Sequence, residues 1–488
     1  MAKRVTVIDI GSNSVRMVIY EKTSRFAFHL LYEEKSKVRI AENAYKNGGV
    51  LQTQPMQRTF DALHDFMQIS QSFQSRKVFC VATSALRDAP NKQEFIQRVK
   101  QKLKLNIKVI SGEKEAYFGA IACANLLPQQ KNALSIDIGG GSTEFALIDA
   151  DNVSHTLSLK LGTVRLKELY FDTNNINAAI TYIDEELEKI PLTNIQTLIG
   201  IGGTFRAISN AIMIQESYPL NKLHAFEYKR KTFEKFIEKV LVSDEKKLKK
   251  LSIEANRFDV IKPGTLILQR LLAKLNIKKI ITSGVGVREG VYLSDLLRNS
   301  NHKFPHNYNT SVRYILDAHV EDVSFANQLS LLSKKLFDLT ADYFHITKEY
   351  KTQLAIAAKL YPAGKSIHFY SQNKHTYYLI QTALEYGFTH KEIMLIATLT
   401  RYAKNKLPST SHLSNYGSLL PQEDVIKPLS YLLSLSIILL SHRPRNIDFS
   451  LSFKEGTLYV SSKNTLYLAR EAATKLHCKN EDFEVIFN

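Results

Sequence analysis

The stretch Val5-Thr-Val-Ile-Asp-Ile-Gly-Ser-Asn-Ser14 decides the fold, because the chain repeats its pattern as Leu134-Ser-Ile-Asp-Ile-Gly-Gly-Gly-Ser-Thr143. Each copy is a run rich in β-branched residues, which predicts a buried strand, followed by a turn of glycine and serine. Glycine permits unusual φ values and has no Cβ, so such a turn can direct several backbone N–H groups at one phosphate group. Two facing copies therefore predict a clamp for neighbouring phosphates.

Each copy places an aspartate, Asp9 or Asp137, near the end of its strand. A carboxylate inside an otherwise hydrophobic run is typical of a residue that holds a cation. We therefore expect Asp9 and Asp137 to bind Mg²⁺ or another divalent cation beside the phosphates. Tight glycine turns are also common as purely structural elements, but two matching copies favour the phosphate and metal interpretation.

The composition sets limits on the fold and the partners. The length of 488 residues suggests about three domains, and a hydrophobic fraction of 44% is ordinary for a globular protein. The formal net charge of +18 favours a polyanion such as a nucleotide, polyphosphate or nucleic acid. The densest basic runs, at 229–231 and 246–250, fall in a helical stretch that also contains glutamate, so a solvated helix face explains them at least as well. We expect no specific nucleic-acid partner.

The cysteines and the apolar stretches indicate the compartment. Cys80, Cys123 and Cys478 are far apart and form no CxxC pair, so neither a disulfide framework nor a zinc site is indicated. The first predicted strand begins close to Met1, which leaves no room for a signal peptide. The longest apolar stretch, residues 429–440, is too short to span a bilayer. These features predict a cytoplasmic protein without membrane association.

Strands and helices alternate along the first two thirds of the chain, which predicts an α/β fold. The pattern restarts with the second copy, so an internal duplication is the economical explanation. We expect domains at 1–128, 129–300 and 301–488. The third is mostly helical and ends in two strands, a helix and a last strand. Among the expected elements are strands at 5–10, 17–20, 77–82, 107–110, 197–201 and 279–282, and a helix at 55–73.

Six motifs occur in order along the first two expected domains: Asp9-Ile-Gly-Ser-Asn-Ser14, Val81-Ala-Thr-Ser-Ala-Leu-Arg-Asp-Ala89, Ile110-Ser-Gly-Glu-Lys-Glu-Ala116, Asp137-Ile-Gly-Gly-Gly-Ser-Thr-Glu144, Gly200-Ile-Gly-Gly-Thr204 and Ser283-Gly-Val-Gly-Val-Arg-Glu-Gly290. Together they resemble the Ppx/GppA family of exopolyphosphatases and guanosine pentaphosphate phosphohydrolases. The resemblance implies two tandem actin-like (ribonuclease H-like) domains, of the actin, sugar-kinase and Hsp70 ATPase superfamily, that close over a phosphate chain in a cleft. It also implies a homodimer.

The resemblance assigns roles to the loops and to several arginines. The guanidinium group suits bidentate phosphate contact, although each arginine can equally form an ordinary surface ion pair. Near the base and ribose of a nucleotide the resemblance places Gly202, Gly203, Thr204 and Gly284, and purely structural turns are the alternative there. The implied phosphate-binding residues are Gly11, Ser12, Asn13, Ser14, Arg39, Arg87, Gly139, Gly140, Gly141, Ser142 and Arg165.

A base that activates water is expected on the helix that follows Ser111, a residue that can serve as its N-cap. Glu113 and Glu115 project to different sides of this helix, so at most one faces a given cleft. Acidic residues also favour a helix N-terminus through the macrodipole. The resemblance implies that Glu115 is the catalytic base, whose pKa Lys114 would lower slightly. It also implies that Glu144 helps to arrange metal or water, although an acidic residue in the first turn of a helix is an equal alternative.

The helical domain departs from the pattern of long family members. Those members resemble HD-type metal phosphohydrolases and carry a Leu-His-Asp-Ile-Gly segment, which matches Leu360-Tyr-Pro-Ala-Gly364 here and has lost both metal ligands. His375, His390 and the segment 401–408 remain at family-like positions. We expect a degenerate HD-like region with a structural role, as a dimer contact or one wall of a basic channel.

The implied reaction is hydrolysis of a terminal phosphoanhydride bond, which relies chiefly on positioning and charge stabilisation. Exopolyphosphatase action on inorganic polyphosphate ranks first, because the chain has an excess of basic residues and resembles the long members of the family. Removal of the 5′ γ-phosphate of guanosine pentaphosphate (pppGpp) uses the same chemistry and can coexist with it. A kinase of the same superfamily ranks lower, since no motif for a second substrate is evident. A nonhydrolytic polyphosphate sensor is disfavoured because both loops and Glu115 are retained.

Overall fold

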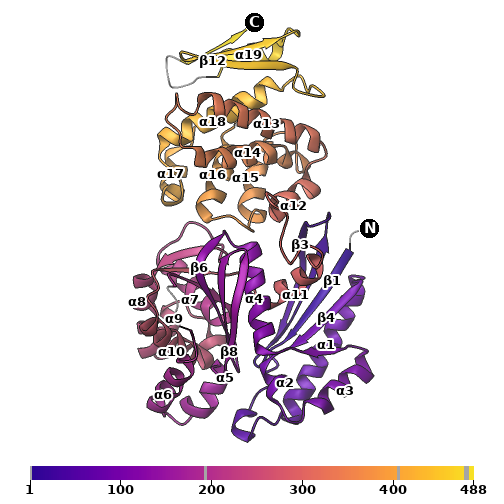
Figure 1. Cartoon of the computed structure of the whole chain (residues 1–488), viewed down its shortest axis with the longest axis vertical. Coiled ribbons are helices and arrows are strands. Elements are labelled where there is room, and N and C mark those ends of the chain that lie inside the picture. Colours follow the sequence, from indigo (N-terminus) through magenta and orange to yellow (C-terminus); the bar gives the residue numbers. More distant parts are fainter. Residues whose placement is uncertain (1–2, 192–194, 404–406, 477–482) are drawn as a thin grey trace. The chain divides into compact units, whose positions relative to one another are not determined.

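The two copies of the repeated stretch form equivalent β-hairpins in the computed structural model, which describes residues 3–191, 195–403, 407–476 and 483–488 (Figure 1). Strand β1 (Lys3–Ile10) pairs antiparallel with β2 (Val15–Lys22), and β6 (Gln130–Ile138) pairs antiparallel with β7 (Thr143–Ala150). Each glycine-containing loop joins the two strands of its hairpin, so the duplication places one phosphate-binding candidate in each sheet.

The two sheets also share their strand order, and an added strand extends the second. The first has the order β3-β2-β1-β4-β5 and the second β10-β11-β9-β6-β7-β8. In each sheet parallel strands extend from the hairpin: β4 pairs with β1 and β5 with β4, and β9 pairs with β6 and β11 with β9. The expected α/β duplication is therefore confirmed. The further strands are β3 (Phe28–Ser36), β4 (Lys77–Ala82), β5 (Ile107–Val109), β8 (Asn152–Leu159), β9 (Thr197–Ile201), β10 (Phe226–Lys229) and β11 (Lys279–Thr282).

Helix α4 (Gly112–Leu126) lies in the first half of the sequence but packs against the second sheet. Its residues Ala120 and Cys123 share a buried cluster with Ile199 and Ile201. Helix α11 (Val287–Leu296), from the second half, packs on both α4 and β1. The chain therefore crosses between the two lobes, and Met1–Tyr308 forms one compact unit.

The remaining helices of this unit cover the faces of the two sheets, and each sheet has its own core of buried aliphatic and aromatic side chains. The helix expected at 55–73 is α1, and the expected strands are present with ends that differ by a few residues. These helices are α1 (Thr53–Ser72), α2 (Ser84–Asp88), α3 (Lys92–Leu103), α5 (Thr163–Leu166), α6 (Ile176–Leu187), α7 (Gly202–Gln215), α8 (Arg230–Val242), α9 (Glu245–Lys250) and α10 (Phe258–Lys274).

The second compact unit, Asn309–Asn488, is helical at first and ends in a small sheet of order β12-β13-β14. It begins at Asn309, so residues 301–308, which the sequence grouped with it, belong to the first unit. The tail contains the expected two strands, helix and last strand. Its elements are α12 (Thr310–His319), α13 (Val323–Thr340), α14 (Lys351–Leu360), α15 (Gln372–Ala383), α16 (His390–Arg401), α17 (Thr410–Tyr416), α18 (Glu423–Leu439), β12 (Phe449–Lys454), β13 (Thr457–Ser462), α19 (Tyr467–Thr474) and β14 (Glu484–Phe487).

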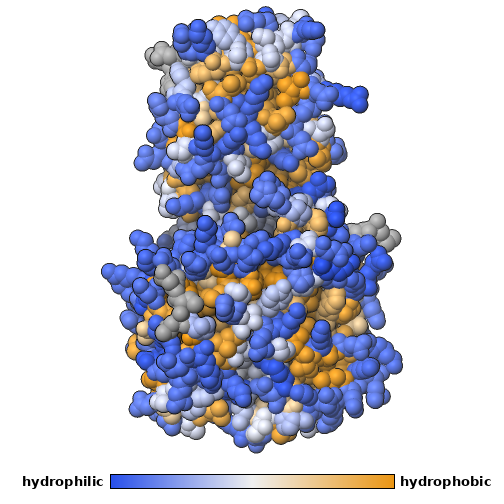
Figure 2. Space-filling model, in the orientation of Figure 1, coloured by the Kyte–Doolittle hydropathy of each residue, from blue (hydrophilic) through white to orange (hydrophobic). Residues whose placement is uncertain are grey.

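Hydrophilic side chains cover most of the face that Figure 2 shows, with smaller hydrophobic areas between them. Within the described part of the chain, no helix is long and apolar enough to cross a membrane. The expected core helix near residue 429 is α18, which is buried along most of its length. Cys80 and Cys123 are buried free thiols, while Cys478 lies outside the described residues.

Candidate active site

The two glycine-containing loops adopt matching turns. The backbone N–H of Gly11 donates to the carbonyl of Ser14 at 3.1 Å, and that of Gly139 donates to Ser142 at 2.9 Å. Other backbone groups hold the carbonyls of the loops, since Arg39 N donates to Asn13 and Val164 N donates to Gly140. Because these carbonyls are held within the protein, the loop N–H groups other than those of Gly11 and Gly139 can serve a bound anion.

The loops approach each other closely enough to require glycine. A Cβ added at Gly140 would lie 2.8 Å from Ser12 Cβ, and one added at Gly141 would overlap the hydroxyls of Tyr45 and Ser84. The absence of a side chain at these two positions therefore lets the loops of the two lobes meet.

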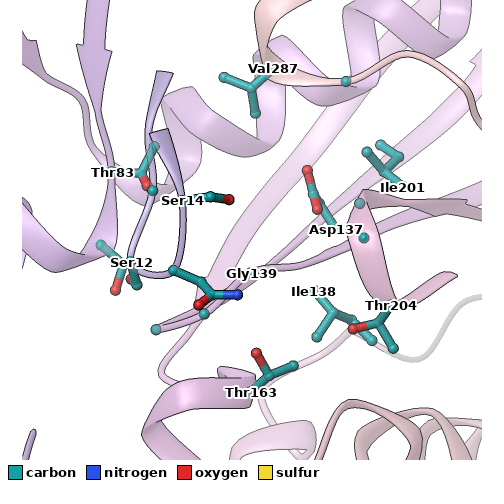
Figure 3. Close-up of a pocket in the computed structure, with 18 of the residues that line it drawn as sticks. Ser12, Ser14, Thr83, Asp137, Ile138, Gly139, Thr163, Ile201, Thr204 and Val287 are labelled. Carbon is teal, nitrogen blue, oxygen red and sulfur yellow. The ribbon is translucent and has the colours of Figure 1, made fainter. Parts of the chain in front are cut away.

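A pocket opens where the loops meet, and both lobes line it (Figure 3). Figure 3 shows Ser12, Ser14 and Thr83 on one side, and Asp137 and Thr204 on the other. Among the sequence-predicted residues, the pocket lining includes Asp9, Gly11, Ser12, Asn13, Ser14, Glu115, Asp137, Gly139, Gly140, Gly141, Ser142, Gly202, Gly203 and Thr204.

The two aspartates occupy equivalent positions in their hairpins, with Asp9 opposite Arg16 and Asp137 opposite Glu144. Burial raises the pKa of both carboxyl groups, that of Asp137 to about 6, against the opposing influence of nearby arginines. Oδ1 of Asp9 is buried without a hydrogen-bond partner among the described residues. An orphaned carboxylate oxygen beside phosphate loops fits a cation ligand. No described group of three or more His, Cys, Asp or Glu side chains could hold a metal by itself.

Glu115 faces the pocket from the first turn of α4. The Ser111 side chain caps this helix by accepting a hydrogen bond from Lys114 N at 3.2 Å, as the sequence predicted. Glu113 is exposed, whereas Glu115 is 8% exposed, so the two acids do project to different sides. Burial, and next the charge of Glu144, raise the pKa of Glu115 well above its usual range.

The slight lowering of that pKa expected from Lys114 stays a prediction, because Lys114 is not among the groups that dominate the shift. The Lys114 ammonium lies over the rings of Tyr117 and Phe118, 4.9 Å from each ring centroid. Arg87 is the cation that contacts the Glu115 carboxylate, and its charge opposes the effect of burial without overcoming it.

Glu144 lies on strand β7, so the alternative of an acidic residue in a helical first turn is wrong. Its side chain is 2% exposed and accepts a hydrogen bond from Ser158 Oγ at 2.8 Å. Burial raises the pKa of Glu144 to about 8, although its hydrogen bonds with Ser142 and Ser158 oppose the rise. Glu144 is therefore placed behind the pocket lining, where its charge acts on Glu115.

The three arginines assigned to phosphate contact are bonded to protein groups. Arg87 donates to Glu115 Oε2 at 2.9 Å and to Ser142 Oγ at 3.2 Å. Arg39 pairs with Asp259 at 2.6 Å, and Arg165 donates to the Gly141 carbonyl at 2.8 Å and to Asp88 at 2.7 Å. Arg87 and Arg165 thus brace the second loop, while Arg39 links the two lobes.

The glycines on the expected nucleotide side separate into two groups. Gly202 has a φ of +83° and lies against Asp137, and Gly203 lies against the Arg257 guanidinium, so both belong to the pocket. Gly284 instead packs on His224, to whose Nδ1 its N–H donates at 3.2 Å, and it is not among the pocket-lining residues.

Four further arginines line the pocket that sequence reasoning did not select: Arg16, Arg206, Arg257 and Arg288. Arg288 is anchored by Glu33 at 2.6 Å, and Arg206 donates to the Ser283 carbonyl at 3.1 Å. Burial and the neighbouring Arg288 and Arg206 lower the pKa of Arg16 to about 10. Several buried arginines lie close together in this pocket, and their positive potential suits an anion with several charges.

The segment that matches the HD motif forms the short helix η5 (Tyr361–Ser366). Gly364 N donates to Thr376 Oγ1 at 2.9 Å, an internal packing contact. His390 begins α16 and is buried, and Arg401 ends α16 with its guanidinium over the Tyr377 ring. His375 lies on α15, and residues 404–406 of the family-like segment lie outside the described residues. The structural role expected of this domain stays a prediction.

Paired hairpins and buried carboxylates from both lobes line one pocket, an arrangement that suits a hydrolase acting on phosphate groups. Residues 18–299 match the Ppx/GppA phosphatase family, and residues 309–481 match domain III of Ppx/GppA phosphatases. The chain therefore belongs to the Ppx/GppA phosphatase family, whose members act on phosphoanhydride bonds.

Named relatives extend this result over nearly the whole chain. The chain is 28% identical to the guanosine-5'-triphosphate,3'-diphosphate pyrophosphatase of Photobacterium profundum, over 93% of this chain and 90% of that protein. The Aquifex aeolicus Ppx/GppA family member has a similar structure, with 28% identity and a TM-score of 0.53 over 62% of this chain and 99% of that one. An exopolyphosphatase from Cytophaga hutchinsonii shares the fold, with 23% identity and a TM-score of 0.57 over 62% of this chain and 100% of that one.

Proposed function

We propose that this protein releases terminal orthophosphate from inorganic polyphosphate. The observation that carries the proposal is one pocket lined by two phosphate loops, two aspartates, Glu115 and four arginines. The described lining contains no aromatic side chain that could stack on a nucleobase. A chain of phosphates therefore suits the pocket better than a ligand recognised by its base.

In this proposal the loops bind the terminal phosphates through backbone N–H groups and the side chains of Ser12, Asn13 and Ser142. Glu115 orients a water molecule in line with the terminal phosphorus and accepts its proton. A new P–O bond forms as the bridging P–O bond breaks, and the shortened chain leaves with the bridging oxygen. Positioning and charge stabilisation supply most of the catalysis in such a step.

Glu144 and the arginines support this reaction without contacting the reacting atoms. Arg87 holds the Glu115 carboxylate and the Ser142 hydroxyl together. Glu144 is hydrogen-bonded by Ser158 and adjusts the charge around Glu115. We therefore assign Glu144 a positioning role.

Asp9 and Asp137 would hold Mg²⁺, or another divalent cation, in this proposal. The orphaned Oδ1 of Asp9 and the burial of both carboxyl groups support the assignment. Mg²⁺ binds through one or two carboxylates plus substrate phosphates, so a full protein cage is unnecessary. When bound, the cation would offset the negative charge of the phosphates.

The second candidate is removal of the 5′ γ-phosphate of pppGpp. The specific observation in its favour is the similarity to proteins named as guanosine-5'-triphosphate,3'-diphosphate pyrophosphatases over nearly the full length of the chain. The same pocket and the same base would serve, and the arginines that line it would contact the remaining phosphates.

Phosphate release by the purified full chain with Mg²⁺ tests both candidates. Long-chain polyphosphate, pppGpp and ATP are compared at equal concentrations of terminal phosphate, with Glu115→Gln as the matched variant. Because Gln keeps the shape but cannot accept the proton, we expect turnover to be abolished while binding persists. Release from neither polyphosphate nor pppGpp would sink the hydrolase proposal, and loss of binding would give Glu115 a structural role.

We further propose that the protein works as a cytoplasmic homodimer, as the family resemblance suggests. Phe369 and Tyr370 in the helical unit are 63% and 75% exposed and offer apolar surface for a partner copy. Light scattering of the purified chain tests the dimer, and a monomeric mass at micromolar concentration would contradict it.

A further inference from the structure

Tyr45 stands between the two phosphate loops although it does not line the phosphate pocket. It follows β3 in the first lobe, and its hydroxyl lies 3.4 Å from Ser12 Oγ of the first loop. The same hydroxyl hydrogen-bonds with Ser84, the first residue of α2. Both serines line the pocket, so Tyr45 contacts the site through two of its walls.

The Tyr45 hydroxyl also contacts the second loop. A Cβ at Gly141 would overlap the Tyr45 and Ser84 hydroxyls and lie 3.0 Å from Ser12 Oγ. The three hydroxyls therefore gather against the α-carbon of Gly141, which belongs to the opposite lobe. Burial raises the pKa of the Tyr45 hydroxyl, so it keeps its proton at neutral pH and can donate.

The Tyr45 ring packs against the hydrophobic core of the first lobe, and polar contacts hold it as well. Its backbone N–H donates to Glu168 Oε2 at 3.2 Å, and the Arg165 guanidinium covers the ring at 4.4 Å from its centroid. Arg165 in turn donates to the Gly141 carbonyl. A cavity of about 340 Å³, lined in part by Tyr45, Asp88 and Arg165, adjoins the ring. Because packing is open on that side, the hydroxyl contacts help to fix where the ring lies.

We propose that Tyr45 is a positioning residue that sets the distance between the two phosphate loops. This inference rests on the proposed role of the loops. Removal of the hydroxyl lets Ser12 and Gly141 move relative to each other, while the pocket arginines still bind the distant phosphates. The terminal phosphate then loses its alignment with Glu115, so the chemical step suffers more than binding does.

Tyr45→Phe tests this inference in the full chain, with kcat and KM measured for phosphate release from polyphosphate. We expect kcat to fall about tenfold, since small misplacements of reacting groups cost large factors in rate, while KM changes by less than about twofold. Tyr182→Phe is the matched control, because its hydroxyl donates to a backbone carbonyl, that of Lys160 at 3.0 Å, away from the pocket. It should leave both constants unchanged.

A double-mutant cycle separates positioning from general destabilisation. If Tyr45 acts through the hydroxyl cluster, Tyr45→Phe and Ser84→Ala together lower kcat by less than the product of their separate effects. Multiplicative effects, a loss confined to KM, or a kcat equal to that of Tyr182→Phe would each overturn the inference. A wild-type chain that releases no phosphate would contradict the proposed function itself, and the inference would fall with it.

Discussion

Arg87 and Glu115 form an ion pair beside the pocket between the two lobes, with Nη1 of Arg87 2.9 Å from Oε2 of Glu115. The same guanidinium donates to Ser142 Oγ and lies 3.9 Å from Glu144. Arg87 thus connects the proposed base, the second phosphate loop and the buried acid on β7. Its charge is the largest influence that opposes the raised pKa of Glu115.

Arg87→Gln should therefore shift the pH dependence of catalysis. Glu115 must be deprotonated to accept a proton, so kcat/KM rises with pH through its pKa. The positive charge of Arg87 lowers that pKa, and its removal raises it, so the acidic limb moves to higher pH. The measurement is kcat/KM against pH for both proteins. Arg98→Gln, which removes a half-buried arginine of α3 that does not line the pocket, should leave the limb in place.

Gly141→Ala should disrupt the site because its Cβ would overlap the Tyr45 and Ser84 hydroxyls. We expect kcat to fall by about a hundredfold, as for a displacement of reacting groups by about 1 Å. Gly417→Ala is the control, since a Cβ there meets nothing within 4 Å. Normal turnover by Gly141→Ala would show that the two loops are free to move apart.

Glu168→Ala should destabilise the contact between the lobes. The Glu168 carboxylate accepts hydrogen bonds from Asn43 N at 2.7 Å and Tyr45 N at 3.2 Å, and it is 7% exposed. Its loss leaves two N–H groups without that acceptor, so the free energy of unfolding should fall by about 1–3 kcal/mol. Urea denaturation measures the change. Glu188→Ala removes an exposed partner of Lys274 and should cost less than about 1 kcal/mol.

Arg257→Gln should weaken substrate binding and make that binding less sensitive to salt concentration. Arg257 lines the pocket and touches Gly203, so it can contact a bound phosphate directly. We expect KM for polyphosphate to rise about tenfold, the effect of one charge-assisted hydrogen bond. The increase of KM with ionic strength should also become shallower. Lys250→Gln removes the same charge from the exposed helix α9, and an equal effect there would mean that only net charge matters.

Local patterns were sufficient to predict most of the fold. Hydrophobic runs predicted β1, β2, β4, β5, β6, β9 and β11 but not β3, β7, β8 or β10, and the serine before a helical pattern predicted the Ser111 cap. Helical spacing predicted that Glu113 and Glu115 face different sides, which the burial of Glu115 confirms. These features depend only on residues that are close together in the sequence, so a single sequence is enough to predict them.

The pocket arginines could not all be predicted, because some are brought to the pocket by contacts between segments that are distant in the sequence. The positions of Arg16 and Glu144 could have been predicted from the sequence. Each follows its aspartate across a short hairpin loop, and pairing the two strands places Arg16 opposite Asp9 and Glu144 opposite Asp137. Arg257 carries no such pattern, since η3 (Ala255–Arg257) is brought to the pocket by tertiary packing alone. The pKa of Glu115 was likewise beyond local reasoning, because burial outweighs every neighbouring charge.

The packing of α11 on β1 has a consequence for protein synthesis. Strand β1 leaves the ribosome long before α11, which covers part of it and ends only at Leu296. Until then the nascent first sheet lacks part of its cover, and the first phosphate loop has no opposite lobe to face. The pocket is therefore completed only after residue 296 has emerged, and before that stage the uncovered part of the first sheet is exposed to misassembly.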